Sequence, residues 1–180
     1  MPNWCNNGLV LTHKDPAMIQ RVVDSASKGI LNEFIPCPQE LVDTVSGFVG
    51  EGQAELEAKQ RANVEKYGYT TWYEHNVNEW GTKWDVTSDT CERVDENTVH
   101  LSFDSAWSPP IGAYQKLEAM GFEVQAFYNE SGMAYCGIYE NGVDECIEYG
   151  SATADTVRDV VGERLDDYFA ISESMEMWEE

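Results

Sequence analysis

The stretch FEVQAFYNESGMAYCGIYENGVDECIEY, residues 122–149, decides the fold class. Apolar and polar residues alternate within it, which is the pattern of strands that have one buried face. Asn141 and Gly142 together form a strong signal for a two-residue hairpin turn, and residues 129–132 have the composition of another tight turn. The pattern therefore predicts three consecutive strands, over residues 122–128, 133–139 and 143–149.

The residues before this stretch predict a helix and, before that helix, further strands. Pro110 suits the first turn of a helix, and the apolar face of that helix would hold Tyr114, Leu117 and Met120. Alternation of apolar and polar residues predicts two strands upstream of the helix, over residues 83–86 and 99–103.

The N-terminal part predicts a strand followed by a helix. Residues 7–12 are rich in strand-forming types. Asp15 is a favourable N-cap, and Pro16 suits the first helical position. Apolar residues then recur at helical spacing as far as Ala26, and Gly29 ends the helix.

The middle of the chain, about residues 38–80, is predicted to be a helical insert. Residues 51–67 are rich in Ala, Glu, Gln and Lys, which favours a polar helix, and residues 70–80 fit a helix with an aromatic face. Apolar residues recur at helical spacing again after Ala154. We therefore expect an α+β domain over residues 1–150 that carries the insert, followed by an acidic C-terminal helix and tail over residues 151–180.

Acidic residues dominate the charge of the chain. Thirty-three Asp and Glu face 11 Lys and Arg, so the formal net charge is −22. Such a surface repels nucleic acid and anionic membranes and attracts basic surfaces. No apolar run approaches the ~20 residues that span a bilayer, and the N-terminus lacks the pattern of a signal peptide. We expect a cytoplasmic protein that binds neither nucleic acid nor membranes directly, and the charge is open to two interpretations, solubility and recognition of a basic partner.

The cysteines and histidines give no sign of a metal site. The five cysteines are odd in number and include no CxxC pair, which is typical of reduced thiols. None of the three histidines stands at zinc-finger spacing from a cysteine pair. Hydrolase, metalloprotease and dinucleotide-binding motifs are absent too, so we expect no metal and no cofactor and favour a protein that is not an enzyme.

Three blocks resemble a known family. They are MPNWCNN at residues 1–7, EWGTKWD at residues 79–85 and FDSAWSPP at residues 103–110. In this order they resemble the YubB-type, or Api-like, proteins of phages and plasmids, and the resemblance covers about residues 1–140. It implies a ferredoxin-like fold, an antiparallel sheet with helices packed on one face, and an origin in a mobile element, but no settled activity. The chain departs from the family pattern in its acidic C-terminus after Gly150.

The same blocks contain four tryptophans and a lysine. The rings belong either to a packed core or to a pocket in which they stack on a base or another small ligand. Gly-Thr-Lys lacks the upstream glycines of a phosphate loop, so the lysine would contact an anion by itself or pair with Asp85 or Glu79. The candidate ligand-binding residues are Trp4, Trp80, Lys83, Trp84 and Trp107.

Three residues are candidates for a reactive group. Pro2 would carry a free secondary amine if the initiator Met were removed. Cys5 has no His or Lys beside it to lower its pKa, which favours a structural thiol. His75 could serve in acid–base chemistry, although a lone histidine is more often a packing or surface residue.

The acidic C-terminal segment is the candidate partner-binding surface, with Glu55, Glu57 and Glu65 adding charge and Phe169, Met175 and Met177 adding apolar anchors. The leading hypothesis is a phage or mobile-element accessory protein that binds and inhibits a host protein with a basic surface, a defence or nucleic-acid-handling factor, by imitating nucleic acid. The alternative is a module that binds a nucleotide or another small molecule in a tryptophan-lined pocket. Removal of the segment after Gly150 is expected to leave the fold intact. The candidate partner-binding residues are Asp155, Asp159, Glu163, Asp166, Asp167, Glu173, Glu176 and Trp178.

Overall fold

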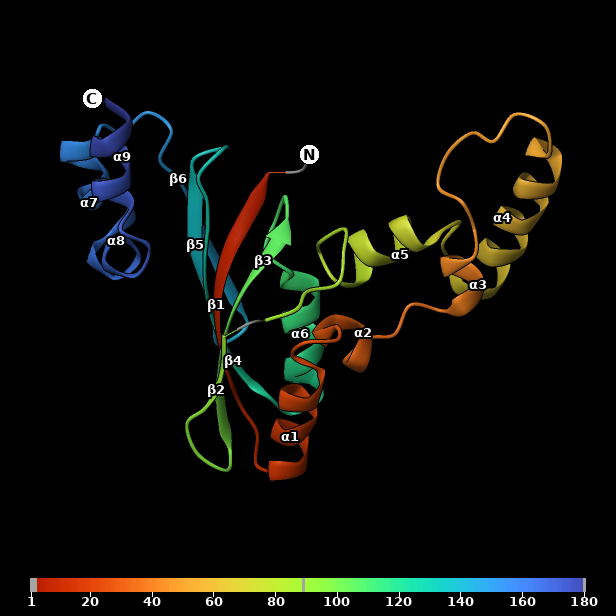
Figure 1. Ribbon diagram of the computed structural model, residues 1–180, viewed down its shortest axis with the longest axis horizontal. Coiled ribbons are helices and arrows are strands. Elements are labelled where there is room, and N and C mark those ends of the chain that lie inside the picture. The colour runs from red at the N-terminus through yellow and green to blue at the C-terminus, as the bar shows by residue number, and fades with distance from the viewer. Residues whose placement is uncertain (1–2, 89, 180) are drawn as a thin grey trace.

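The computed structural model describes residues 3–88 and 90–179 of the chain, although not the side chains of Trp178 and Glu179. Over these residues the chain forms a six-stranded antiparallel sheet in the order β2-β3-β1-β4-β5-β6 (Figure 1). The strands are β1 (Trp4–Thr12), β2 (Thr90–Arg93), β3 (Thr98–Ala106), β4 (Glu123–Glu130), β5 (Tyr135–Glu140) and β6 (Val143–Glu148).

The first four strands form the ferredoxin-like unit that the resemblance implies. Helix α1 (Pro16–Ser25) follows β1, and helix α6 (Ile111–Ala119) follows β3, while β1 lies between β3 and β4 and is antiparallel to both. The hairpin of β5 and β6 extends the sheet beyond β4. The expected α+β class and antiparallel sheet are therefore confirmed.

The main core lies between one face of this sheet and the helices α1, α2 (Ile30–Phe34) and α6 (Figure 1). Alternate residues of β1, such as Leu9 and Leu11, point into it and pack against Ile19 and Val22 of α1. The predicted start of α1 is confirmed, because the Asp15 carboxylate accepts a hydrogen bond of 2.9 Å from the Ala17 amide. Burial of these apolar side chains supplies most of the driving force for folding.

Helices α3 (Gln39–Val42), α4 (Gln53–Tyr67) and α5 (Trp72–Glu79) lie between α1 and β2 in the chain. Figure 1 shows that α3 and α4 project away from the sheet, whereas α5 lies between α4 and α6. The Asn63 amide joins them, since it donates to the Thr44 hydroxyl (2.9 Å) and to the Thr70 carbonyl (3.0 Å). The exposed face of α4 carries Glu55, Glu57 and Glu65.

The expected strand over residues 83–86 is wrong. The segment is irregular, and the short edge strand β2 begins later, at Thr90. The alternation that predicted the strand is real, because Trp84 is exposed and Val86 is buried. Asp85 lies between these two residues, and its carboxylate accepts hydrogen bonds from the amides of Leu31 and Val86 (2.8 Å each). The bond to Leu31 attaches the segment to α2, and residues 83–86 do not form a strand.

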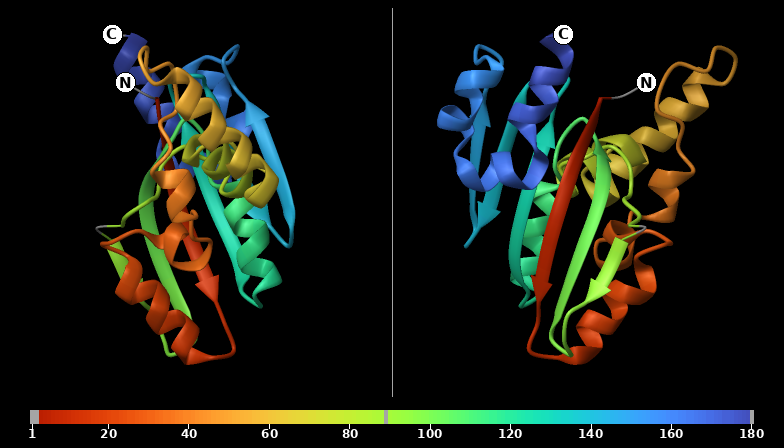
Figure 2. Two further views of the ribbon diagram at one scale, coloured as in Figure 1. Left: turned by 90° about the vertical axis from the view of Figure 1, so that its right-hand side faces the viewer. Right: turned by 60° about the vertical axis from the view of Figure 1, so that its left-hand side comes forward.

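The structure resolves the C-terminal helical region into three helices, α7 (Ala154–Val161), α8 (Glu163–Phe169) and α9 (Ile171–Glu179). The breaks fall at Gly162 and at Ala170, which both have positive φ, 82° and 50°. The three helices cover the opposite face of the sheet at its β4–β6 end (Figures 1 and 2). Their apolar residues form a second core with residues of β4 and β5 and with Tyr149: the core consists of Phe127, Cys136, Tyr149, Val157, Val161, Leu165 and Ile171.

Among the described residues, no helix combines the length and the apolar composition that a membrane crossing requires.

Candidate functional site

Three tryptophans are exposed at the end of the sheet where β1 begins and β3 ends. Trp4 opens β1 opposite Ala106, and the Trp107 amide donates to the Asn3 carbonyl (2.9 Å). Trp84 comes from the segment after α5, and its ring centroid is 5.9 Å from that of Trp4. The exposed fractions of Trp4, Trp84 and Trp107 are 47%, 38% and 42%. Tryptophan is usually well buried, so three partly exposed indoles in one place indicate a contact surface, which we call the tryptophan surface.

Lys83 lies on this surface. Its Nζ atom is 4.7 Å from the ring centroid of Trp84 and 4.9 Å from that of Trp107, distances at which an ammonium group is attracted by an indole face. The expected pairing of Lys83 with Asp85 or Glu79 is wrong. Asp85 binds backbone amides, Glu79 pairs with Lys116 (2.9 Å), and no ion pair of Lys83 occurs within residues 3–88 and 90–179. Within the described residues, the Lys83 ammonium therefore contacts aromatic rings rather than a carboxylate.

The backbone fixes the position of Trp107. Its φ is 69°, in the left-handed region that a residue with a bulky side chain rarely adopts. Besides the amide bond to Asn3, the Trp107 carbonyl accepts a hydrogen bond of 2.6 Å from the Tyr135 hydroxyl, and Pro109 and Pro110 follow. Such a conformation costs on the order of 1–3 kcal/mol and persists where the surroundings enforce it, often at functional positions. Trp107 is thus held with its ring outward.

A groove begins beside Trp4 and continues over the face of β1 and β3. It is a cavity of about 530 Å³, lined along the strands by Asn6, Ser102 and Asp104 and on the far side by Tyr168 and Phe169 of α8. We call it the sheet groove. The right-hand view in Figure 2 shows β1 and β3 uncovered beside α7–α9 on this face.

The sheet groove is acidic and aromatic in character. The exposed Asp104 carboxylate accepts a hydrogen bond of 2.6 Å from the Asn6 amide. A neighbouring cavity of about 360 Å³ shares Ser102 and Tyr168 with the groove and adds Glu92 and His100. Carboxylates beside aromatic rings suit a cation rather than a phosphate.

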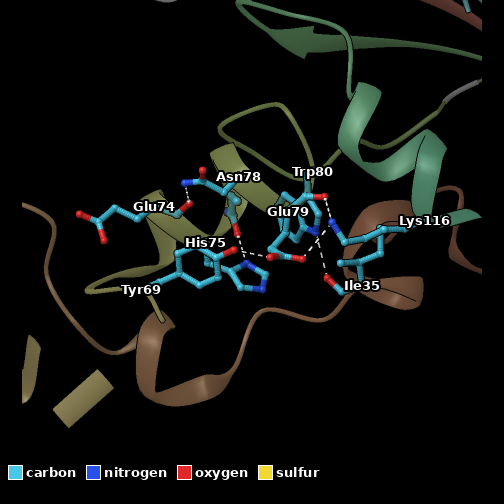
Figure 3. Close-up of polar contacts among 9 residues, drawn as sticks. Ile35, Tyr69, Glu74, His75, Asn78, Glu79, Trp80 and Lys116 are labelled. Carbon is cyan, nitrogen blue, oxygen red and sulfur yellow. Dashed lines mark hydrogen bonds and ion pairs between the residues drawn. The ribbon is translucent and has the colours of Figure 1, made fainter. Parts of the chain in front are cut away.

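Trp80 does not belong to this site, and its assignment to a ligand pocket is wrong. Its side chain is 3% exposed and packs in the main core. The indole Nε1 donates a hydrogen bond of 2.9 Å to the Ile35 carbonyl, as Figure 3 shows. The four candidate tryptophans therefore divide into one core residue and three surface residues.

His75 also has a packing role. It is buried in α5 between Tyr69 and Trp80, which meet its ring edge-on (Figure 3). Its Nδ1 atom is 3.1 Å from the Asn76 side-chain oxygen. Nearby, the Tyr69 hydroxyl and the Lys116 ammonium both donate to Glu79, and these bonds lower the pKa of that carboxyl. Bonding to Glu79 also raises the pKa of Tyr69 to about 12. The cluster joins α5 to α6 through fully paired groups.

Two candidates for a reactive group remain, Cys5 and Pro2, and the structure describes only Cys5. Cys5 is fully buried, and burial raises the pKa of its thiol to about 12, so the thiolate that a nucleophile needs is not formed near neutral pH. Pro2 lies outside the described residues.

Most of the candidate partner-binding carboxylates are exposed on the C-terminal helices, but Asp166 is not. Its side chain is 2% exposed and accepts hydrogen bonds from the Ser172 amide (2.7 Å) and from Arg158 (2.8 Å). The role of Asp166 in partner binding is therefore corrected to a structural one that joins α7, α8 and α9. Asp167 contacts the same guanidinium at 2.7 Å, so the two adjacent carboxylates converge rather than diverge. The exposed carboxylates are Asp155, Asp159, Glu163, Asp167, Glu173 and Glu176, while the Trp178 side chain lies outside the described part.

Of the expected apolar anchors, Met177 is strongly exposed, whereas Phe169 and Met175 pack partly against the second core. Because the C-terminal helices turn at Gly162 and Ala170, their carboxylates do not follow one continuous helix face.

Asp166 gives a prediction for stability. Burial opposes ionisation of this carboxyl, but the bonds from Ser172 and Arg158 outweigh it and lower its pKa. We expect Asp166→Asn to lower the free energy of unfolding by about 2 kcal/mol at pH 7, because a hydrogen bond to a charged group contributes roughly 1.5–3 kcal/mol. A depressed pKa stabilises the fold above the unfolded-state pKa of about 3.9, and this stabilisation is lost as the pH falls through the folded-state pKa.

Urea unfolding at pH 7 and at pH 3 measures this effect. The difference between the wild type and Asp166→Asn should be largest at pH 7 and smaller at pH 3, because the stabilisation declines as the pH falls below the unfolded-state pKa and is lost through the lowered folded-state pKa. Asp167→Asn is the control, since this mostly exposed carboxylate contacts the same arginine and its loss should cost less than about 1 kcal/mol. An equal loss for Asp166→Asn at both pH values would contradict the role of the charge.

Of the residues that line the sheet groove, sequence reasoning named Trp4 and Phe169 but missed Asn6, Ser102, Asp104 and Tyr168. Asn6 and Asp104 alternate with buried neighbours along β1 and β3, so the alternation marks them as outward-facing, but nothing local shows that the two strands pair. Tyr168 lies off the apolar spacing of its helix. It stacks on Phe127 with ring centroids 4.9 Å apart and remains exposed.

Comparison with known proteins gives a distant likeness. No family model matches the chain, and no curated protein matches it significantly. Among solved structures, it is similar to the crystal structure of the protein api92 from Yersinia pseudotuberculosis, which is described under the family model DUF1281. The TM-score is 0.45 at 13% identity, and the match covers 83% of this chain and 99% of that chain. The likeness is distant, and no argument rests on it.

Proposed function

We propose that this protein is a non-enzymatic interaction protein that binds a partner protein with a basic surface. The observation that carries the proposal is the concentration of exposed indoles beside an acidic groove, in a chain of net charge −22. Charge alone fits a merely well-solvated protein. The tryptophan surface supports recognition, because such indoles are the common anchors of protein interfaces.

The two features would act at different stages of binding. The overall negative potential draws a basic partner in and raises the rate of encounter. The indoles then supply buried apolar area, which holds the complex together once it has formed. Because the proposal needs both, charge should govern association and the tryptophans should govern dissociation.

A protein that handles nucleic acid is the partner class with the required surface. Its basic groove is built for phosphates, and a carboxylate-rich surface that covers the groove would keep nucleic acid out. We therefore include inhibition by occlusion in the proposal, with a host-defence or nucleic-acid-handling factor as the partner and a phage or other mobile element as the source. The exposed carboxylates of α7–α9 support attraction over a broad surface.

The salt dependence of binding tests this proposal. An octa-arginine peptide serves as the probe and an octa-glutamate peptide as the control. We expect binding of octa-arginine, measured by isothermal titration calorimetry, to weaken by on the order of ten- to a hundredfold between 0.05 M and 0.5 M NaCl. At the higher salt concentration, charges separated by more than a few ångströms are screened from one another. Binding that does not change with salt, or equal binding of octa-glutamate, would contradict the proposal.

A second candidate function is binding of a nucleotide or another small molecule at the tryptophan surface. The observation in its favour is the cavity of about 530 Å³ beside Trp4, with Lys83 close by as a cation. The carboxylate of Asp104 in the groove opposes a phosphate there. Quenching of tryptophan fluorescence by AMP and by uncharged adenosine separates the cases, since this function predicts quenching by at least one of them at micromolar concentration and the interaction-protein proposal predicts quenching by neither.

A further inference from the structure

Lys83 places an ammonium group over two indole rings of the tryptophan surface. Indole is the aromatic ring that attracts cations most strongly, and the Lys83 ammonium lies within 5 Å of the ring centroids of both Trp84 and Trp107. The Tyr73 ring centroid lies 6.0 Å from the same ammonium. The chain thus places one of its own cations in an aromatic site.

The backbone of this site is rigid, but the lysine side chain is held weakly. The Lys83 carbonyl accepts a hydrogen bond of 3.0 Å from the Asn76 amide, and the Thr82 hydroxyl donates to the Ala106 carbonyl (2.9 Å). The ammonium itself makes no ion pair within the described residues, so cation–π contacts are what holds it over the rings. Such contacts are weak at exposed sites, and the flexible stem of lysine lets the ammonium move into water at little cost.

We propose that Lys83 is an internal occupant of a recognition site for one arginine side chain of the partner, which displaces the lysine and stacks between Trp84 and Trp107. This inference rests on the proposed function and names the group that is recognised. Arginine fits better than a second lysine, because guanidinium is planar, stacks on aromatic faces and is more weakly hydrated than ammonium.

Charge around the site favours the same occupant. Trp4 and Asn6 lie on one face of β1, and Asp104 pairs with Asn6 in the register of β1 and β3, so Asp104 lies one step along the groove from the tryptophan surface. Its carboxylate can accept a further hydrogen bond, since its recorded partner is the Asn6 amide alone within the described part of the chain. A basic segment with one arginine between the indoles can thus place its next cation beside Asp104.

Removal of the internal occupant should strengthen binding. We expect Lys83→Met, which keeps the length of the stem, to bind octa-arginine about two- to fivefold more tightly than the wild type, because the competing cation–π contact is gone. Lys14→Met is the matched control, since Lys14 is exposed just beyond the end of β1 opposite Trp4, and its loss reproduces only the general change in charge.

Removal of an aromatic wall should weaken binding. We expect Trp84→Leu to weaken binding of octa-arginine by at least about fivefold, as for an anchor in the centre of an interface. Trp72→Leu is the matched control, because this half-buried tryptophan of α5 meets the Tyr73 ring edge-on and makes no recorded contact with Lys83. The circular dichroism spectrum and the urea midpoint confirm that each variant is folded.

The outcomes separate the two proposals. If octa-arginine binds in a salt-dependent way but Lys83→Met equals Lys14→Met and Trp84→Leu equals Trp72→Leu, the arginine site is overturned and the proposed function stands. If octa-arginine fails to bind the wild type at low salt, both are overturned. Tighter binding by Lys83→Met and weaker binding by Trp84→Leu, each relative to its control, is the expected result.

Discussion

A chain that ends at Gly150 is expected to lose its stable native state, contrary to the expectation from sequence that the fold would remain intact. Val157, Val161, Leu165 and Ile171 are buried against the sheet. Burial of one such side chain contributes about 1.5–3 kcal/mol, and a whole domain is stable by only about 5–15 kcal/mol. Truncation removes these contacts and also uncovers Phe127 and Cys136 on the sheet and Tyr149 just after β6.

Urea unfolding and binding of the dye ANS measure this effect. The shortened chain should unfold at a much lower urea concentration and bind ANS, because an apolar sheet face is open to water. Leu165→Ala is the milder version of the same test, and a loss of about 2–5 kcal/mol is expected at this fully buried position. Val160→Ala on α7 is its control, since that side chain is 45% exposed and its truncation should cost less than about 0.5 kcal/mol. A shortened chain that unfolds like the full one and binds no ANS would contradict the claim that the second core stabilises the fold.

Gly137→Ala is expected to have the next largest effect. A Cβ atom added to Gly137 would lie 2.3 Å from the Tyr128 hydroxyl oxygen and 2.5 Å from the Glu145 carbonyl oxygen. The Glu145 oxygen belongs to the backbone of β6, and Tyr128 is fully buried with its hydroxyl bonded to Asp144 (2.7 Å), so neither can move away easily. We expect a loss of about 3 kcal/mol, at the upper end of the usual cost of overpacking.

The effect should reach the tryptophan surface as well. Tyr135 precedes Gly137 by two residues on β5 and donates the hydrogen bond that holds the Trp107 carbonyl. Gly137→Ala should therefore lower both the urea midpoint and the affinity for octa-arginine. Gly150→Ala is the control, because the nearest atom to its added Cβ is 3.5 Å away, an ordinary contact. If Gly137→Ala behaves like Gly150→Ala in both measurements, the close packing of β5 on β6 and on Tyr128 does not determine the stability of the fold or the position of Trp107.

The parts of the fold that depend on local signals could be predicted from the sequence. Asp15 and Pro16 begin α1, and the alternation of Phe122, Val124 and Ala126 identifies the face of β4 that packs on the main core. The start of β1 at Trp4 could not be predicted, because residues 4–6 are held as a strand by pairing with residues about a hundred positions later. Of the two breaks after Ala154, Gly162 is a visible signal, whereas Ala170 gives none because alanine normally continues a helix.

The candidate site was only partly visible for the same reason. The sequence grouped four tryptophans but could not show that Trp80 faces Ile35 in the core while the other three face outward. Asp166 and Asp167 are adjacent and look equivalent, yet Arg158 and Ser172 meet around Asp166 only after α7, α8 and α9 have packed together. Which carboxylate is buried depends on tertiary packing, and no local pattern encodes it.

The most direct test of the central claim is a titration with octa-arginine followed by the indole N–H signals in ¹H–¹⁵N NMR spectra, with each signal assigned by a single Trp→Phe variant. The account predicts that the signals of Trp84 and Trp107 shift as binding saturates. The signal of Trp80 should stay in place, because its N–H is bonded to the Ile35 carbonyl in the core. Saturable binding with Trp84 and Trp107 unmoved, or with Trp80 shifting as far as they do, would contradict it.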